Sequence, residues 1–178
     1  MGWRITGFPV ALALMLGSAE LASAGPFDRP LKTYGLVINE ILRQAGSDLR
    51  FQLDRCSTAH QAVCRFSSLH VAVVVEGQKG PASISRIVIA TDLLRDHPTT
   101  PPHVAVIDTL ITLTATMMIF DPDLPDDQRD GLVSTLAEAA HSAGQGEGSG
   151  IAADYVIALE QNVTTLLVIA MAPKPSLR

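Results

Sequence analysis

The sequence LHVAVVV at residues 69–75 is followed by GQKGP at 77–81 and by ISRIVIA at 84–90. Both apolar runs are rich in β-branched residues, which favour strands, and the glycines and proline between them favour a short turn. We therefore predict a β-hairpin over residues 69–90. Because its first run is almost wholly apolar, we expect that strand to lie centrally in a sheet.

A second hairpin is predicted just before this one. The segments 50–56 and 62–66 are separated by STAHQ at 57–61, and Cys56 and Cys64 flank this turn. A hairpin registered near residue 60 places the two cysteines opposite each other on adjacent strands. In an exported protein this favours a structural disulfide over a redox pair, because the spacing is not Cys-x-x-Cys.

Helical periodicity appears on both sides of these strands. A helix is predicted over 29–45, where Pro30 follows Asp28 and Gly46 follows the last apolar position. A second helix is predicted over 103–120, with one polar side formed by Asp108, Thr109, Thr112 and Thr116. That segment also has the roughly 18 apolar residues of a membrane span. We interpret it as a helix packed on a sheet, because its polar side makes it amphipathic and it ends at Asp121-Pro122.

The last third of the chain adds one helix and one hairpin. A helix is predicted over 123–143, with Pro125 in its first turn. The aspartates around its start do not match a calcium loop and are interpreted as helix caps and partners of the helix dipole: Asp121, Asp123, Asp126, Asp127 and Asp130. The sequence GQGEGSG at 144–150 is predicted to be a flexible loop, followed by strands at 151–159 and 163–171.

The predicted order of elements is α-β-β-β-β-α-α-β-β. Consecutive strands joined by short turns pair antiparallel, so residues 25–178 are expected to form a single α+β domain. Its antiparallel sheet has about six strands, and three helices pack on one face. The last hairpin can join either edge of the first four strands.

Residues 1–24 have the layout of a cleaved secretory signal peptide. Arg4 precedes an apolar stretch at 5–16, and Ala22-Ser23-Ala24 forms an Ala-x-Ala exit. The apolar stretch is shorter than the roughly 20 residues of a membrane span. We predict cleavage after Ala24 and a periplasmic or secreted protein, with no membrane span in the mature chain.

Composition disfavours nucleic acid as a partner. The chain has 13 Lys and Arg against 18 Asp and Glu, a net charge of −5, and removal of the signal peptide leaves that charge unchanged. This composition gives no basic excess of the kind that binds a phosphate backbone, and the 4% of aromatic residues offers few rings for stacking bases.

Motifs for catalysis or metal binding are weak. None of the five histidines forms an i,i+4 pair or a His-Glu-x-x-His motif. The densest group of possible ligands is Asp96, His97 and His103, with Asp92 nearby. We predict no catalytic residue, metal or cofactor, and retain these residues only as weak metal candidates.

Three functions remain open. The favoured one is an exported, non-enzymatic binding or adaptor domain, which presents a sheet face or edge to a protein partner or to a second copy of itself. The second is a carrier of a small apolar ligand, bound between the sheet and the helix that contains Met117 and Met118. The least favoured is a metal-dependent hydrolase that uses His97 and His103.

Overall fold

The fold is described from a computed structural model, covering residues 25–57, 62–77, 83–93, 101–161 and 165–174. The predicted signal peptide at 1–24 lies outside the described residues, as do Asp96 and His97. The helices are the 3-10 turn η1 (Leu31–Thr33), α1 (Tyr34–Gln44), α2 (Pro102–Phe120) and α3 (Asp126–Ala143). The strands are β1 (Gln52–Ser57), β2 (Ala62–Ser68), β3 (Val71–Gly77), β4 (Ile84–Asp92), β5 (Gln145–Ser149), β6 (Ala153–Gln161) and β7 (Thr165–Pro173).

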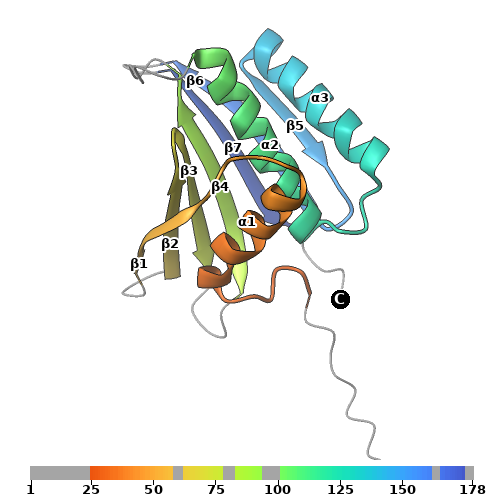
Figure 1. The fold of residues 1–178 in the computed structure, drawn as a ribbon. Coiled ribbons are helices and arrows are strands. Elements are labelled where there is room, and N and C mark those ends of the chain that lie inside the picture. The colour runs from red at the N-terminus through yellow and green to blue at the C-terminus, as the bar shows by residue number, and fades with distance from the viewer. Residues whose placement is uncertain (1–24, 58–61, 78–82, 94–100, 162–164, 175–178) are drawn as a thin grey trace, which may run out of the picture.

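The predicted α+β class is confirmed. Seven antiparallel strands form one sheet in the order β1-β2-β3-β4-β7-β6-β5. The three helices lie on the same side of this sheet (Figure 1). Strand β3 is interior, as expected of its apolar sequence, but the centre of the sheet is β4.

The last hairpin joins the edge that β4 leaves open. Strand β7 pairs with β4 along residues 166–171, and β6 then pairs with β7. These strands begin at Ala153 and Thr165, two residues later than predicted. This pairing brings the C-terminal strands beside the N-terminal ones in a single sheet.

The prediction of a flexible loop at 144–150 is wrong. Residues Gln145–Ser149 form β5, which pairs with β6 at the edge of the sheet. A Cβ atom on Gly146 would lie 2.5 Å from the Leu136 carbonyl oxygen, and one on Gly148 would lie 2.5 Å from Cδ1 of Leu132. The glycines are therefore required by the close approach of α3 to the strand, rather than by a turn.

Helix α2 buries its polar side. Thr109, Thr112 and Thr116 are fully buried, and each hydroxyl donates to the carbonyl oxygen four residues earlier, which satisfies it without water. Ile107 and Met118 are about half exposed. Pro102–Phe120 is also the one helix in the described ranges with the length and hydropathy of a membrane span, and half of it is buried within the fold.

The core lies between the helices and the inner side of the sheet. Val73, Ile87 and Ile169 are fully buried on three adjacent strands. Tyr34 of α1 and Phe120 of α2 pack against each other, with ring centroids 6.3 Å apart.

The aspartates predicted to cap helices divide into two kinds. Asp126 and Asp127 lie in the first turn of α3, where a negative charge favours the helix dipole. Asp121, by contrast, is fully buried and accepts hydrogen bonds from the β5–β6 region. Its interpretation as a cap or dipole partner is therefore replaced by a long-range structural role.

Candidate binding surface

The side of the sheet that faces away from the helices carries an apolar patch. Among the described residues, no helix or strand lies over this side (Figure 1). Its central positions are half buried and hold only alanine and valine. We call these residues the open-face patch: Ala72, Val74, Val88, Ala90, Val156, Ala158 and Ala170.

The alternation of each strand sets this patch apart from the core. In β3, the side chains of Val71, Val73 and Val75 are buried on the helix side, whereas Ala72 and Val74 are less buried. An antiparallel sheet with one solvent-exposed face usually has polar residues at such outward positions. Here the centre of the outward face is apolar instead, and its small side chains leave it without bulky projections.

Two arginines border the patch on one side. Arg55 of β1 and Arg65 of β2 are direct cross-strand partners, and both are exposed. Successive side chains of a strand point to opposite faces, and the neighbouring pair, Cys56 and Cys64, packs into the core. The two arginines therefore lie on the open face. Neither guanidinium forms an ion pair or hydrogen bond within the described ranges. Asp54 of β1 is also exposed at this edge, where its carboxylate accepts a 2.7 Å hydrogen bond from the Ser67 hydroxyl, so two arginines stand beside one carboxylate and the edge is net basic.

Acidic side chains border the patch on the other side. Glu147 of β5 pairs with Val156 of the patch, and its carboxylate accepts a 2.7 Å hydrogen bond from Gln145. Asp154 and Glu160 of β6 are also exposed. The two ends of the sheet therefore carry opposite charge on the same face.

One row of cross-strand partners shows this polarity across the whole sheet. Each residue of the row is the direct partner of the next on the neighbouring strand. From β1 to β5 the row reads Arg55, Arg65, Val74, Val88, Ala170, Val156 and Glu147. Along this row the open face is thus basic at one edge, apolar in the middle and acidic at the other edge.

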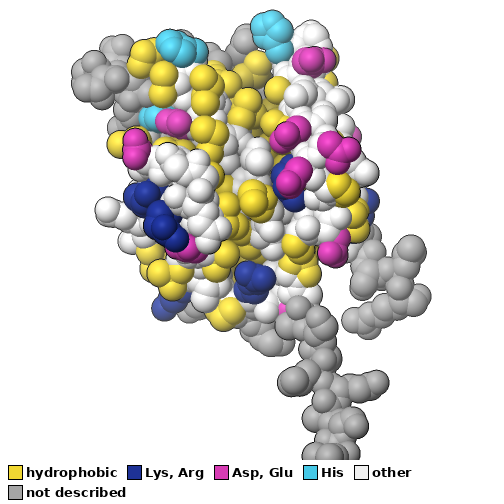
Figure 2. Space-filling model, turned by 45° about the vertical axis from the view of Figure 1, so that its right-hand side comes forward, with side chains coloured by type: hydrophobic (Ala, Val, Ile, Leu, Met, Phe, Trp, Pro, Cys, Tyr) yellow, Lys and Arg dark blue, Asp and Glu magenta, His cyan; other side chains and the backbone are white. Residues whose placement is uncertain are grey.

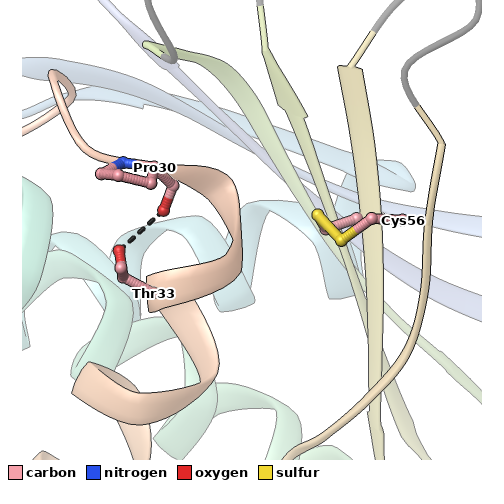
Figure 3. The surroundings of a disulfide bond; sticks show 4 residues. Pro30, Thr33 and Cys56 are labelled. Carbon is pink, nitrogen blue, oxygen red and sulfur yellow. Dashed lines mark hydrogen bonds between the residues drawn. A yellow bond between two sulfur atoms is a disulfide. The ribbon is translucent and has the colours of Figure 1, made fainter.

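Cys56 and Cys64 form a disulfide, in the register that the hairpin predicts. Their Cα atoms are 4.1 Å apart, and the bond links β1 to β2 on the helix side of the sheet (Figure 3). The bond lies one residue from both Arg55 and Arg65. It therefore holds the two strands together at the point where the arginines repel each other.

The helix layer has two apolar grooves. One, of about 350 Å³, lies between α1 and α2 and is lined by Ile107, Leu110 and Met118 among others. The second, of about 240 Å³, lies between α2, α3 and the sheet and includes His141. Hydrophobic side chains run along this layer in Figure 2. Met117 itself is fully buried in the core, so of the two predicted carrier methionines only Met118 faces a groove.

Sequence reasoning missed a histidine–aspartate contact. Nε2 of the buried His70 lies 3.1 Å from Oδ2 of Asp108. Because His70 is in the β2–β3 turn and Asp108 is in α2, this contact links the turn to the helix. Asp108 also lines an open hollow of about 490 Å³, together with Ser47 and Leu69. In the sequence, His70 and Asp108 each stand out as a polar residue within an apolar segment. That the two side chains meet depends on how α2 crosses the sheet, which the sequence does not show.

Of the weak metal candidates and the nearby Asp92, only His103 and Asp92 are among the described residues. His103 is exposed in the first turn of α2, and Asp92 ends β4. Asp96 and His97 belong to residues 94–100, which are outside the described ranges. Within those ranges, no group of three His, Cys, Asp or Glu residues is arranged to hold a metal ion.

Comparison of the chain with protein-family models, with curated proteins and with solved structures finds no match in any of the three.

Proposed function

We propose that this chain is an exported, non-enzymatic binding domain that holds a protein partner on the open face of its sheet. The supporting observation is the open-face patch, a group of small apolar residues on four adjacent strands bordered by opposite charges. Burying apolar surface stabilises a complex by about 25 cal/mol per Å² before the costs of association. The charged borders add orientation, because they favour a partner whose charges are complementary.

Export is part of this proposal. The leader-like sequence at 1–24 supports it, and the Cys56–Cys64 disulfide suits an oxidising compartment such as the periplasm or the extracellular space. Intact mass and N-terminal sequencing of the protein from its host's exported fraction test this part. A mature chain that begins at Gly25 is expected, whereas a chain retained in the cytoplasm with its leader would contradict it.

Site-specific photocrosslinking tests the binding face. A benzophenone amino acid at Ala90, in the open-face patch, should give one discrete adduct in the exported fraction, identifiable by mass spectrometry. The matched control carries the same amino acid at Asp130, which is exposed on α3 in the other layer. Adducts from position 130 with none from position 90 would place the binding surface on the helix layer and refute the proposal.

A second candidate function is carriage of a small apolar ligand. The observation that favours it is the groove between α1 and α2, where Ile107 and Met118 are 52% and 45% exposed. A fluorescent apolar probe such as anilinonaphthalene sulfonate tests it. Met118→Asp should abolish probe binding if the groove is the site, and Val88→Asp should leave it unchanged. Equal binding by both variants and the original chain would exclude the groove.

A further inference from the structure

We infer that the partner on the open face is a second copy of this chain, stacked sheet to sheet about a two-fold axis that runs parallel to β4 and β7. This inference rests on the proposed function, since it names the protein that the open-face patch binds. It is carried by the distribution of charge and apolar residues across the seven strands.

Of the two in-plane two-fold axes that lie parallel or perpendicular to the strands, the parallel one makes the charge pattern self-complementary. A two-fold dimer presents the same surface on both copies. Rotation about an axis parallel to the strands reverses the strand order, so the basic β1–β2 edge of one copy lies over the acidic β5 edge of the other. Rotation about an in-plane axis perpendicular to the strands would instead place arginine over arginine. The charges therefore select the first arrangement.

The central side chains also match in that arrangement. With the axis between β4 and β7, β4 of one copy faces β7 of the other, β3 faces β6, and β2 faces β5. Val88 then lies opposite Ala170 of the second copy, and Val74 opposite Val156. Residues this small allow two sheets to approach to the roughly 10 Å spacing of packed sheets, with strands aligned to within about 30°.

The same register places an acidic residue of the second copy opposite one of the two arginines. Arg65 lies opposite Glu147 of the second copy, and the two-fold axis repeats this pair on the other side. Arg55 lies beside Arg65 and adds to the attraction. Two features are unfavourable: Glu76 comes opposite Asp154, and Asp54 lies on the open face at the edge that Glu147 of the second copy approaches. Arg86 is the direct cross-strand partner of Glu76 and lies on the same face, where it offsets the repulsion between Glu76 and Asp154.

The face is large enough for such a dimer. In this register β1 has no strand opposite it, and the six overlapping strands, spaced by about 4.8 Å with about seven residues each at about 3.3 Å, give a sheet plane of roughly 650 Å². Stable protein interfaces bury about 800 Å² on each partner. Because side-chain relief makes the accessible area larger than the plane, overlap of these six strands reaches that size.

Sedimentation velocity on the mature chain, residues 25–178, tests the inference. We expect a dimer at 10 µM in 50 mM NaCl that weakens in 500 mM NaCl, because salt screens the charge pairs at its rim. Arg65→Glu and Glu147→Arg should each raise the dimer dissociation constant by about tenfold or more. The double variant should recover most of that loss, because it restores the pair with its charges exchanged. Glu138→Arg on α3 is the matched charge-reversal control and should change nothing.

A second variant separates this face from any other dimer contact. Ala90→Asp places a charge in the centre of the patch and should give a folded monomer, as judged by circular dichroism. A wild-type chain that stays monomeric, or a dimer that survives Ala90→Asp, Arg65→Glu and Glu147→Arg alike, would overturn the inference. If the chain is monomeric but a benzophenone at Ala90 captures a different protein, the proposed function stands without the dimer. If it captures nothing, both are refuted.

Discussion

The phenol of Tyr155 donates a 3.0 Å hydrogen bond to Oδ2 of Asp121, although the two residues are 34 positions apart. The other carboxyl oxygen of Asp121 accepts 2.9 Å from the backbone N–H of Ala152. Asp121 ends α2, whereas Ala152 and Tyr155 belong to the turn into β6 and to β6 itself. A single buried carboxyl group therefore fixes the end of the core helix to the C-terminal part of the sheet.

Asp121→Ala should destabilise the fold by about 2–5 kcal/mol. The substitution leaves the buried phenol of Tyr155 and the part-buried N–H of Ala152 without their acceptor, and an unsatisfied buried group costs about 1–3 kcal/mol. Urea unfolding followed by circular dichroism measures the change. Asp123→Ala, two residues away and exposed, is the control and should cost under about 0.5 kcal/mol. Equal effects of the two substitutions would show that the buried network contributes nothing.

Gly150 is required by the same network. A Cβ atom there would lie 1.9 Å from Oδ2 of Asp121, closer than any real contact. Gly150→Ala should therefore displace the Asp121 side chain and lower the free energy of unfolding by about 1–3 kcal/mol. In the Asp121→Ala background the same change should cost much less, because the obstructing oxygen is gone. A double-mutant cycle measures this coupling, and strict additivity would argue against the clash.

The two glycines of β5 that face α3 should differ in how much stability each loses on substitution by alanine. Gly146→Ala brings a Cβ onto the Leu136 backbone, which cannot move without moving the helix, whereas Gly148→Ala meets the end of the Leu132 side chain. We expect a loss of about 1–3 kcal/mol at Gly146 and a smaller one at Gly148. Gly131→Ala, inside α3 with no atom within 4 Å, is the matched control and should stabilise by about 0.5–1 kcal/mol. A larger loss at Gly148 than at Gly146 would contradict this ranking.

These glycines show why part of the fold was not predictable. The hairpins over 50–90 follow from β-branched runs separated by turn residues, and the cysteine spacing indicates the β1–β2 register. In 144–150, glycine composition favours a loop, although the glycines alternate as a strand requires. The segment forms a strand because α3 packs closely on it. That packing is a tertiary contact, so the local sequence does not reveal it.

The open face was predictable only in outline. An exposed sheet face follows from the count of helices and strands. Its charge polarity does not, because Arg65 and Glu147 share a row only once β7 pairs with β4. The sequence leaves that edge choice open. Similarly, the threonine side of α2 could be read as solvent-facing, since nothing local shows that the hydroxyls bond to their own helix.

Alkaline pH should unfold the protein through its two tyrosines. Burial raises the pKa of Tyr34 well above its usual value of 10, against a smaller opposite effect of its hydrogen bond with Thr116. Burial, then the nearby Asp121 charge, raises the pKa of Tyr155 as well. A raised folded-state pKa means that stability is complete below pH 10 and is lost as the pH rises toward the folded value, by about 1.4 kcal/mol per pH unit for each tyrosine.

Urea unfolding at pH 8, 10 and 11 measures this loss. Tyr34→Phe should remove about half of the tyrosine-dependent decline between pH 10 and 11, although it also lowers stability at pH 8 by about 1 kcal/mol through the lost hydrogen bond. Because the chain has only two tyrosines, the Tyr34→Phe, Tyr155→Phe double variant reports the decline due to lysines and other groups. An unchanged slope in the double variant would show that the buried phenols are not responsible.

Removal of the Cys56–Cys64 disulfide should loosen the basic edge of the sheet and leave the acidic edge intact. Cys56→Ser with Cys64→Ser opens a short loop, which costs about 2–3 kcal/mol on the chain-entropy model. It also releases the strand pair on which Arg55 and Arg65 repel each other, so hydrogen exchange should accelerate over β1 and the paired part of β2, but not over β6 and β7.

Arg65→Gln in the cysteine-free background should recover part of the protection, and 500 mM NaCl should do the same by screening. Uniform acceleration across all seven strands, insensitive to Arg65→Gln and to salt, would show that the bond stabilises the whole domain instead of this edge.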